Sequence, residues 1–243
     1  MFSALYYLVC VVLCVVVLLL SLVALVVCYP FDPGRRVVHE LSRVLTRIFF
    51  FIPPLWRHRV IGVENADPEK AYIIVLNHSA MIDIPSLYFV RGMNFRWVSK
   101  REVFRLPFFG QFLLLHGDIP IDRGHGSEAL KQMIERGRVW IKRGVSISIF
   151  PEGTRSKDGE IHRFKSGAFI LAKECDVEIL PVVLDGTRTV FKKNRLFNWR
   201  NTITVKVLEP VPVEEVRSKE AHDLMAETQE RMCNALKEIR ETK

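Results

Sequence analysis

A long uncharged segment near the N-terminus constrains this chain more than any other feature. Residues 4–29 are 26 consecutive uncharged residues, most of them Val and Leu. As a helix this segment would be about 39 Å long at 1.5 Å per residue, and the hydrocarbon core of a bilayer is about 30 Å thick. The segment is therefore predicted to be a hydrophobic membrane-anchoring helix, long enough to span with some tilt.

A cleaved signal peptide is the alternative interpretation of this segment, and the sequence disfavours it. Signal peptides begin with basic residues, have a shorter apolar core and end in small residues at the cleavage site. These features are missing here. Residues 30–34 (PFDPG) are expected to end the helix, because two prolines and a glycine do not continue it.

The charges that follow the apolar segment are unevenly distributed. No Lys or Arg precedes Arg35, whereas residues 35–243 carry 35 basic and 26 acidic groups. By the positive-inside rule, the rest of the chain is expected on the cytoplasmic side of the cell membrane. The excess of positive charge predicts an anionic partner, which could be nucleic acid, a membrane surface or a phosphorylated substrate.

Residues 35–56 have the pattern of an amphipathic helix. Apolar residues recur at helical spacing, namely Val37, Leu41, Val44, Leu45, Ile48 and Ile52. The other side carries His39, Arg43, Thr46 and Arg47. Nearby aromatic residues suit the lipid interface, and an ordinary helix packed on the core is the alternative. The two segments together, residues 1–58, are predicted to form the membrane anchor, either as a span or as a hairpin in one leaflet.

The remaining chain, residues 59–243, is predicted to be one α/β domain. Runs rich in β-branched residues predict strands at residues 72–76, 95–99, 145–150, 179–184 and 202–208. Helical spacing of apolar residues predicts helices at residues 127–143, 166–174 and 213–240. Such alternation indicates a mixed, mainly parallel sheet flanked by helices.

The cysteines indicate a reduced compartment. There are five of them, an odd number, and three lie in the apolar segment. Because no pair has the C-x-x-C spacing, neither a disulfide framework nor a metal cluster is expected.

The segment Asn77–Asp83 (NHSAMID) directly follows the predicted strand 72–76 and holds the strongest candidate for catalysis. Histidine exchanges a proton most readily near neutral pH. Asp83 could hold the other ring nitrogen of His78, fixing the tautomer. On one regular helix a spacing of five would place the two side chains about 140° apart. The pair therefore needs His78 in a loop and Asp83 on the first helical turn. A capping Asn77 or Ser79 with an incidental surface histidine is the alternative.

Three further segments are candidates for the site, two with charged or polar side chains and one that is apolar. Residues 117–124 (GDIPIDRG) include Arg123, a permanently charged fork suited to phosphate, or else a solvated turn arginine. Residues 151–156 (PEGTRS) combine Glu152, Gly153, Thr154 and Arg155 directly after a strand, which suits the binding of polar or phosphorylated hydroxyl compounds. A plain turn built from Pro and Gly is the alternative. Residues 180–182 (LPV) are apolar and carry no reactive group.

These four segments, in this order, resemble the motifs of the lysophosphatidic acid acyltransferases, within the glycerolipid acyltransferase superfamily. Asn77, His78 and Asp83 match N-H-x-x-x-x-D, and residues 117–123 resemble G-x-I-x-I-D-R. Residues 151–156 match P-E-G-T-R-S, and residues 180–182 match the proline-centred block. Residues 98–110 also look like the family's segment between the first two motifs. The resemblance covers about residues 60–210.

The resemblance implies a reaction and roles for the residues. His78 would take the proton from the free hydroxyl of lysophosphatidic acid, supported by Asp83, and the oxygen would attack an acyl-CoA or acyl carrier protein thioester. Arg123 and Arg155, with Lys100 as a weaker candidate, would hold the phosphate. Glu152 would fix the acceptor or its own loop. No metal and no cofactor besides the thioester co-substrate is expected.

Alternatives remain open within and outside this class. Glycerol-3-phosphate or another lysophospholipid could be the acceptor. From other classes, a metal-dependent hydrolase could use His78, Asp83 and Glu152, and a lipid-binding protein would need no such pair. The family often has Gln-Ser after the histidine, whereas this chain has Ser79-Ala80, and Pro120 stands where many relatives have an aromatic or aliphatic residue. Acceptor and acyl-chain preference are therefore less safely inferred.

Residues 187–200 (TRTVFKKNRLFNWR) mix basic and aromatic side chains. On composition alone this resembles a nucleic-acid patch. Beside a membrane anchor, contact with anionic lipid headgroups is the preferred interpretation, with a solvated loop as the alternative. Membrane lipids and no nucleic acid are thus the expected partners.

Overall fold

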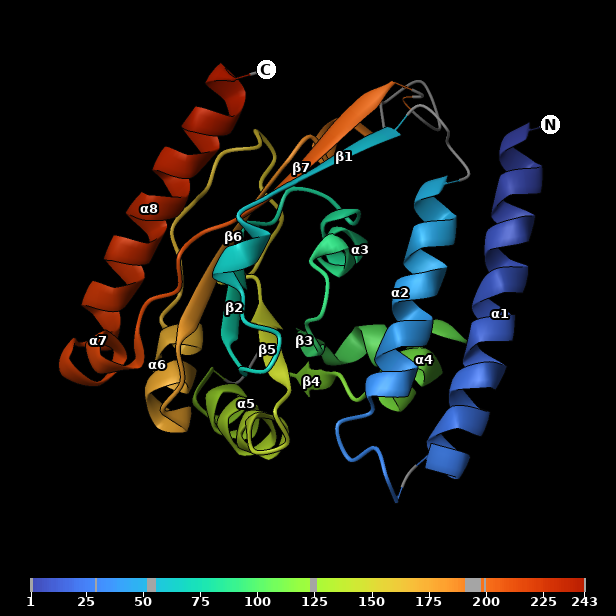
Figure 1. Ribbon diagram of the computed structural model, residues 1–243, viewed down its shortest axis with the longest axis horizontal. Coiled ribbons are helices and arrows are strands. Elements are labelled where there is room, and N and C mark those ends of the chain that lie inside the picture. Colours follow the sequence, from blue (N-terminus) through green and yellow to red (C-terminus); the bar gives the residue numbers. More distant parts are fainter. Residues whose placement is uncertain are drawn as a thin grey trace.

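The computed structural model describes residues 2–28, 30–51, 56–122, 126–190, 198 and 200–242. Over these residues a seven-stranded sheet lies between two layers of helices. Helices α5, α6, α7 and α8 lie on one side of the sheet, and α1, α2, α3 and α4 on the other (Figure 1). The predicted α/β class with a mixed, mainly parallel sheet is confirmed.

The element bounds follow the predicted pattern closely. The strands are β1 (Trp56–Ile61), β2 (Ile73–Leu76), β3 (Phe95–Lys100), β4 (Ile119–Ile121), β5 (Ser146–Ile149), β6 (Ile179–Asp185) and β7 (Asn201–Val207). The helices are α1 (Phe2–Cys28), α2 (Arg36–Phe51), α3 (Asp83–Ser86), α4 (Phe109–His116), α5 (Gly126–Ile141), α6 (Gly167–Cys175), α7 (Val213–Ser218) and α8 (Ala221–Glu241). Short 3₁₀ turns include η2 (Leu87–Phe89) and η4 (Arg188–Val190). All five predicted strands are present, and β1 and β4 were not predicted.

The predicted C-terminal helix is divided in two. Lys219 and Glu220 have extended backbone, so α7 ends before them and α8 begins after them. The Lys219 carbonyl accepts a hydrogen bond from Lys173 Nζ of α6 instead of continuing the helix. A contact with a neighbouring helix thus replaces a local hydrogen bond.

The strand order is β1-β7-β6-β2-β5-β3-β4. Every neighbouring pair is parallel except β6 and β7, which are antiparallel. Strand β1 crosses the boundary predicted between residues 58 and 59, because its pairing with β7 begins at Trp56. The sheet therefore begins close to the end of α2.

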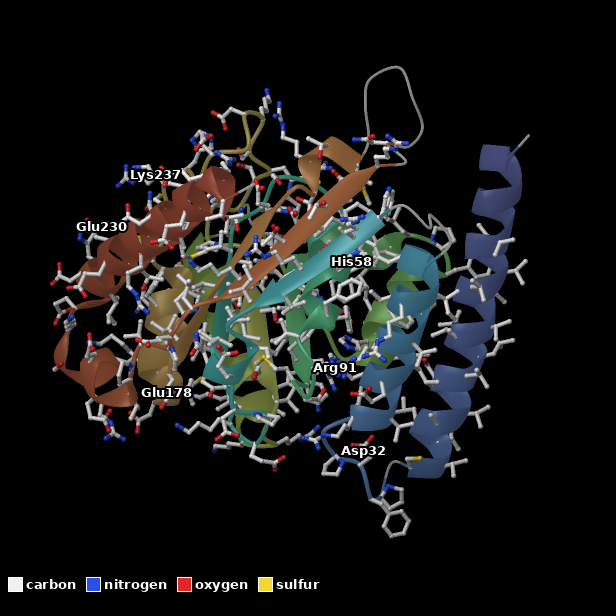
Figure 2. The ribbon with its side chains drawn as sticks, turned by 45° about the horizontal axis from the view of Figure 1, so that its top comes forward. Asp32, His58, Arg91, Glu178, Glu230 and Lys237 are labelled. Atoms are coloured by element: carbon white, nitrogen blue, oxygen red, sulfur yellow. The ribbon has the colours of Figure 1, made fainter. Side chains whose placement is uncertain are left out.

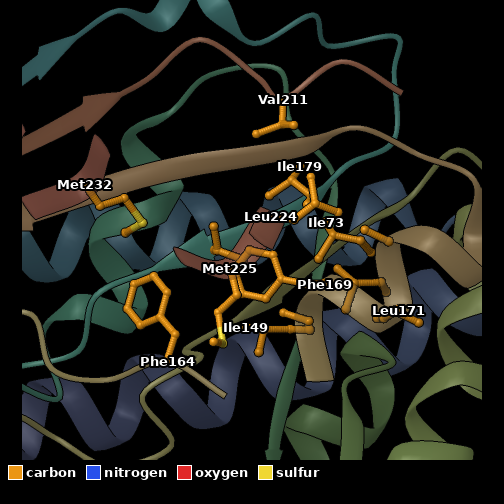
Figure 3. Packing of buried hydrophobic residues seen from close by; sticks show 14 of the residues in the cluster. Ile73, Ile149, Phe164, Phe169, Leu171, Ile179, Val211, Leu224, Met225 and Met232 are labelled. Atoms are coloured by element: carbon orange, nitrogen blue, oxygen red, sulfur yellow. The ribbon is translucent and has the colours of Figure 1, made fainter. Parts of the chain in front are cut away.

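Both faces of the central strands are buried, as expected for parallel strands covered by helices. In β2, Ile73 and Val75 face the cluster built on α5, α6 and α8, whereas Ile74 and Leu76 face the cluster under η2. Figure 3 shows the first cluster, in which Phe169 of α6 and Met225 of α8 pack with Ile73. These buried layers hold the carboxyl ends of β2, β5 and β6 in place.

Helix α1 is long and apolar enough to cross a membrane, judged by length and composition. Its window Val11–Cys28 is only 12% buried within the protein. Figure 2 shows side chains without charged groups along the outer side of α1, whereas charged residues such as Glu230 and Lys237 cover α8. Helix α1 lies beside α2 and α4 (Figure 1).

Helix α2 buries several polar side chains against the domain. His39, Ser42, Arg43 and Thr46 are buried. The exposed side chains include Val37, Val44 and Ile48. The buried side of α2 is thus more polar than that of a helix packed on a water-soluble core, whose apolar side faces inward. The apolar side chains of Val38 and Phe50 are buried as well, and the charged residues Arg36, Glu40 and Arg47 are exposed, so both sides of α2 are mixed.

Buried polar contacts join the α1–α2 turn to the sheet. Arg96 of β3 is fully buried, and its Nη2 donates to the carbonyl of Gly34 at 2.5 Å. His39 Nδ1 lies 3.1 Å from His116 Nε2, and His116 Nδ1 lies 2.7 Å from Asp118 Oδ1. Because these groups have given up their hydration, they fix the position of α2 on the domain.

The stability of this contact region is expected to depend on pH through His58. Its ring stacks on Phe89 at 4.0 Å and meets the edge of Phe50 of α2 at 4.6 Å between centroids; Figure 2 shows where it lies on β1. Burial lowers the pKa of His58 from 6.5 to about 4. Between these values the unfolded chain binds a proton that the folded chain does not, so stability falls as the pH falls through 6.5.

Replacing His58 with Phe removes this titration while keeping an aromatic ring. Between pH 7.5 and pH 5, the Tm of the wild type is expected to fall further than that of His58→Phe. The difference should be about 2–4 °C for each kcal/mol of unfolding free energy that the wild type loses by protonation of His58 in the unfolded chain. Calorimetric or fluorescence melts at both pH values test this. His222→Ala, at an exposed histidine of α8, should keep the wild-type slope. Equal slopes for wild type and His58→Phe would show that His58 titrates normally in the folded protein.

Candidate active site

The candidate site lies at the carboxyl end of β2, in the middle of the sheet. Asn77, the residue after β2, is buried and clasps the backbone of Leu184 in β6. Its amide nitrogen donates to the Leu184 carbonyl at 2.9 Å, and its side-chain oxygen accepts from the Leu184 N–H at 2.8 Å. This paired contact holds the following loop, which begins with His78, against the neighbouring strand.

His78 and Asp83 form the predicted pair. His78 lies in the loop and Asp83 begins α3, as the five-residue spacing requires. The distance between His78 Nδ1 and Asp83 Oδ2 is 2.8 Å. The same oxygen also accepts from the backbone N–H groups of Ser79 and Ala80, at 2.6 and 2.7 Å. Asp83 is fully buried, so the loop is closed around a carboxylate that cannot turn away from the ring.

The imidazole of His78 is held at the surface by aromatic stacking. Its ring lies parallel to that of Phe150, with 4.0 Å between centroids, and Phe150 in turn stacks on Trp97 at 5.1 Å. The His78 side chain is 15% exposed. Among the described residues none contacts Nε2 by a hydrogen bond. With Nδ1 directed at Asp83, Nε2 is the nitrogen available to a substrate.

The PEGTRS loop holds the backbone of His78 from the other side. The Glu152 carboxylate accepts from the His78 N–H at 2.8 Å and from the His162 N–H at 3.1 Å. The Ser156 N–H donates to the His78 carbonyl at 2.7 Å. Burial raises the pKa of Glu152, and the two backbone N–H groups oppose that rise. Of the two roles proposed for Glu152, this geometry supports the fixing of the loop.

The loop turns tightly at Gly153. The φ of Gly153 is 74°, a region that side-chain-bearing residues avoid. Its N–H donates to the Phe150 carbonyl at 3.1 Å. The turn directs Thr154 and Arg155 outward, and both are exposed. They are thus available to a ligand above the loop.

In the strand order, β3 lies on the same side of β2 as β5 and the PEGTRS loop that follows β5. Lys100 is exposed at the end of β3, and β3 is separated from β2 by β5. Arg123 lies outside the described residues, so its predicted role stays a prediction. The described part of the chain holds no group of three or more His, Cys, Asp or Glu residues that could bind a metal ion.

An apolar pocket of about 270 Å³ opens beside this loop. Its lining includes Phe150, Pro151, Ile149, Leu130 and Met133. The pocket therefore extends from the stacked ring of the site towards α5. Pro151 and Gly153 of the PEGTRS loop are part of its lining, and Lys165 is the one charged residue among the described lining residues.

Several contacts of the site were not predicted. The stack of Phe150 on His78 joins two segments that are 72 positions apart in the sequence. Ser79 Oγ lies 3.0 Å from Thr187 Oγ1, and Asn77 binds Leu184 rather than capping a helix. The aromatic residue directly before PEGTRS was the available signal for the first contact. Most of the basic-aromatic segment 187–200 lies outside the described residues.

Comparison with known proteins supports the motifs. A family model described as Acyltransferase matches residues 57–185, more than half of the chain. The human 1-acyl-sn-glycerol-3-phosphate acyltransferase beta is 31% identical over 201 residues, which cover 82% of this chain and 72% of the human protein. The sheep 1-acyl-sn-glycerol-3-phosphate acyltransferase alpha is 30% identical over 226 residues, which cover 92% of this chain and 77% of that protein.

Other matches differ in the share of their length that is covered. A 1-acyl-sn-glycerol-3-phosphate acyltransferase of Cocos nucifera is 34% identical, but the match covers 63% of this chain and only 49% of the plant protein. The chain thus spans about half the length of this relative. The crystal structure of the 1-acyl-sn-glycerophosphate acyltransferase PlsC from Thermotoga maritima has a TM-score of 0.66, with 97% of this chain and 98% of that chain covered. At 23% identity this match shows a shared fold.

Proposed function

The chain belongs to the family of 1-acyl-sn-glycerol-3-phosphate acyltransferases, and from this premise we propose that it acylates the free hydroxyl of lysophosphatidic acid. The donor is a fatty acyl thioester of CoA or acyl carrier protein, and the product is phosphatidic acid. The observation that carries the proposal is the His78–Asp83 pair, fixed by the PEGTRS loop with Nε2 directed away from Asp83.

His78 acts as the general base in this reaction. Its Nε2 takes the proton from the acceptor hydroxyl, whose oxygen attacks the thioester carbonyl carbon. A C–O bond forms and the C–S bond breaks. The thiolate that leaves takes up the proton from the His78 imidazolium and departs as the thiol. Asp83 holds Nδ1 and stabilises the imidazolium while it exists. The thioester is a co-substrate, so this mechanism needs no further cofactor.

No nucleophilic side chain of the protein is required. Outside α1 the described cysteines are Cys175 and Cys233, and neither belongs to the loops at the site. Burial raises the pKa of the Cys175 thiol to about 11, and burial also raises the pKa of Cys233. Because the thiolate is the nucleophilic form, these thiols are poorly suited to form an acyl-enzyme. Direct attack by the acceptor hydroxyl fits this distribution.

The acceptor phosphate needs cations close to His78. Arg155 is exposed on the loop that holds His78, and Lys100 is exposed at the end of β3. Arg123 follows β4, the neighbour of β3 in the sheet. A guanidinium binds a phosphate in a bidentate manner, so we assign the phosphate to Arg155 and Arg123, with Lys100 as support. The apolar pocket beside Phe150 has room for hydrocarbon.

The apolar helices suit an enzyme whose acceptor is a membrane lipid. Helix α1 exposes apolar side chains, and α2 exposes Val37, Val44 and Ile48 beside its charged residues. In water such surfaces are unfavourable, whereas they are compatible with the acyl region of a bilayer. We therefore place the protein at the cell membrane, with the catalytic domain on the cytoplasmic side.

An acceptor panel tests the proposed reaction. The purified protein is given a radiolabelled long-chain acyl-CoA together with lysophosphatidic acid, glycerol-3-phosphate or lysophosphatidylcholine. We expect product with lysophosphatidic acid at a rate at least about 10-fold above the other two. Glycerol-3-phosphate lacks the acyl chain, so its apolar contacts are lost, and lysophosphatidylcholine has a choline ester in place of the phosphate monoester, so a contact to a charged group of about 1.5–3 kcal/mol is lost. Faster transfer to another acceptor would reassign the substrate. Release of free fatty acid with no acylated product, sensitive to a chelator, would instead indicate a metal-dependent hydrolase.

A further inference from the structure

A wide groove opens at the same edge of the sheet as His78, beside β6, β7 and β1. Its volume is about 1160 Å³. Five arginines line it, namely Arg57, Arg59, Arg188, Arg200 and Arg240. We refer to it below as the arginine groove. A single phosphate ion would leave most of this volume empty, so the groove suits a larger anion.

Strand β1 supplies one wall of the arginine groove. Arg57 and Arg59 are two residues apart in β1, so their side chains lie on the same face of the strand. Their partners in the parallel register of β7 are Thr202 and Thr204, which also line the groove. The opposite face of β1 carries His58, which packs on α2. The wall therefore combines guanidinium and hydroxyl donors, the two kinds of side chain that bind phosphate oxygens.

Most of the positive charge in the arginine groove is not neutralised by nearby acids. Within the described part of the chain, Arg57, Arg59, Arg188 and Arg200 make no ion pair, and Arg240 is paired with Glu160 at 2.6 Å. The acidic lining residues are Asp158 and Asp185. Asp158 accepts from Ser156 Oγ at 2.7 Å, and Asp185 lies 3.4 Å from Arg240. The exposed arginines are thus left facing the cavity.

The arginine groove reaches the catalytic loop. Ser79, the residue after His78, is part of its lining. In the strand order β1 is three strands from β2, which is about 14 Å at the usual strand spacing. Lys100 is at the end of β3, and Arg155 is in the PEGTRS loop that follows β5. Both strands lie on the side of β2 that is opposite to β6, β7 and β1. The reaction joins two anionic substrates, and the protein offers a basic region on each side of His78.

We propose that the arginine groove binds the phosphorylated nucleotide of a CoA thioester, so that its pantetheine arm extends past Ser79 to His78. This inference rests on the proposed function and selects CoA as the donor. The nucleotide carries several phosphates at one end of a long arm, whereas the reactive thioester is at the other end. A donor of this shape needs its phosphates held at a distance from the base, and the arginine groove lies at such a distance.

The first test is binding without turnover. The probe is 3′-phosphoadenosine 5′-phosphate, the nucleotide part of CoA, titrated calorimetrically into the full-length protein in detergent. The double variant Arg57→Gln/Arg59→Gln is expected to bind it at least about 10-fold more weakly than the wild type. Lys131→Gln/Arg136→Gln, which removes two exposed charges from α5, should bind like the wild type. Absence of binding to the wild type, or equal binding by the Arg57/Arg59 variant, overturns the proposal.

The second test separates the nucleotide from the other anions. In the Arg57/Arg59 variant, the KM for acyl-CoA should rise about 10-fold or more, while kcat and the KM for lysophosphatidic acid stay within about twofold of the wild type. With acyl-pantetheine, which lacks the nucleotide, variant and wild type should react equally. A rise in the KM for lysophosphatidic acid alone would assign the groove to the acceptor. A loss confined to acyl carrier protein donors, or to binding of anionic vesicles, would assign it to that protein or to lipid headgroups.

These outcomes are distinct from a failure of the proposed function. If the wild type transfers no acyl group to any acceptor, the proposed reaction is wrong, yet nucleotide binding still decides what the arginine groove holds. Both substituted arginines are exposed and unpaired within the described chain. Exposed substitutions of this kind usually change stability by less than about 0.5 kcal/mol. A folded variant is therefore expected, and an unchanged melting curve verifies it.

Discussion

Replacement of His78 by alanine is expected to lower the rate of acyl transfer by about 10²–10⁴-fold, the usual contribution of general-base catalysis. The change removes the imidazole, and with it Nε2, the atom that accepts the proton from the acceptor hydroxyl. The backbone contacts of His78 with Glu152 and Ser156 do not depend on the ring, so the loop should keep its shape. Initial rates with saturating acyl-CoA and lysophosphatidic acid measure the effect.

A matched histidine on the surface provides the control for this change. His222 lies near the start of α8, and its side chain is 76% exposed. His222→Ala should keep full activity. Both variants should sediment with membranes like the wild type, because α1 and α2 are unchanged. Retention of more than a few per cent of activity by His78→Ala would remove His78 from the role of base.

The change Asp83→Asn is expected to have an effect of similar size, about 10²–10⁴-fold on kcat, although it replaces only one carboxylate oxygen by an NH2 group. Asp83 Oδ2 accepts from His78 Nδ1 and from two backbone N–H groups. An amide can present an N–H to the ring, which would favour the wrong tautomer and leave the imidazolium without its counter-charge. The KM values should change little, since Asp83 is fully buried.

A double-mutant cycle decides whether Asp83 acts through His78. If it does, His78→Ala/Asp83→Asn should be no slower than His78→Ala alone, because groups that act as one unit are not additive. Asp223→Asn on α8, with its side chain 64% exposed, serves as the control for the loss of one carboxylate. Additive losses in the double variant would instead show that Asp83 contributes separately, for example by holding the fold of the loop.

The central part of the fold could be predicted because it depends on local patterns. Residues 72–76 and 179–184 are continuous apolar runs, and such runs form strands that are buried on both faces. The edge strands were harder. Strand β4 has three residues and contains Pro120, and β1 has arginines on its open side. Their pairing with β3 and β7 is a property of the assembled sheet and leaves little trace in the local sequence.

The same limit applies to the site. The spacing of His78 and Asp83 indicated the pair, because a loop followed by a first helical turn can bring residues five apart together. The stack of Phe150 on His78 and the clasp of Asn77 on Leu184 depend on which strands are neighbours. The burial of polar side chains of α2 was unexpected for a similar reason. Only the position of Arg96 and His116 beneath the helix explains it.

The way α2 is attached has a practical consequence for preparing this enzyme. Deleting residues 1–55 in search of a detergent-free protein would remove the Gly34 carbonyl that accepts from Arg96 and the His39 ring beside His116. A desolvated cation would lose an acceptor, at a loss of several kcal/mol where no replacement forms. The N-terminal helices are therefore an integral layer of the catalytic domain. A protein without residues 1–55 needs new hydrogen-bond partners for Arg96 and His116 before it can be expected to fold.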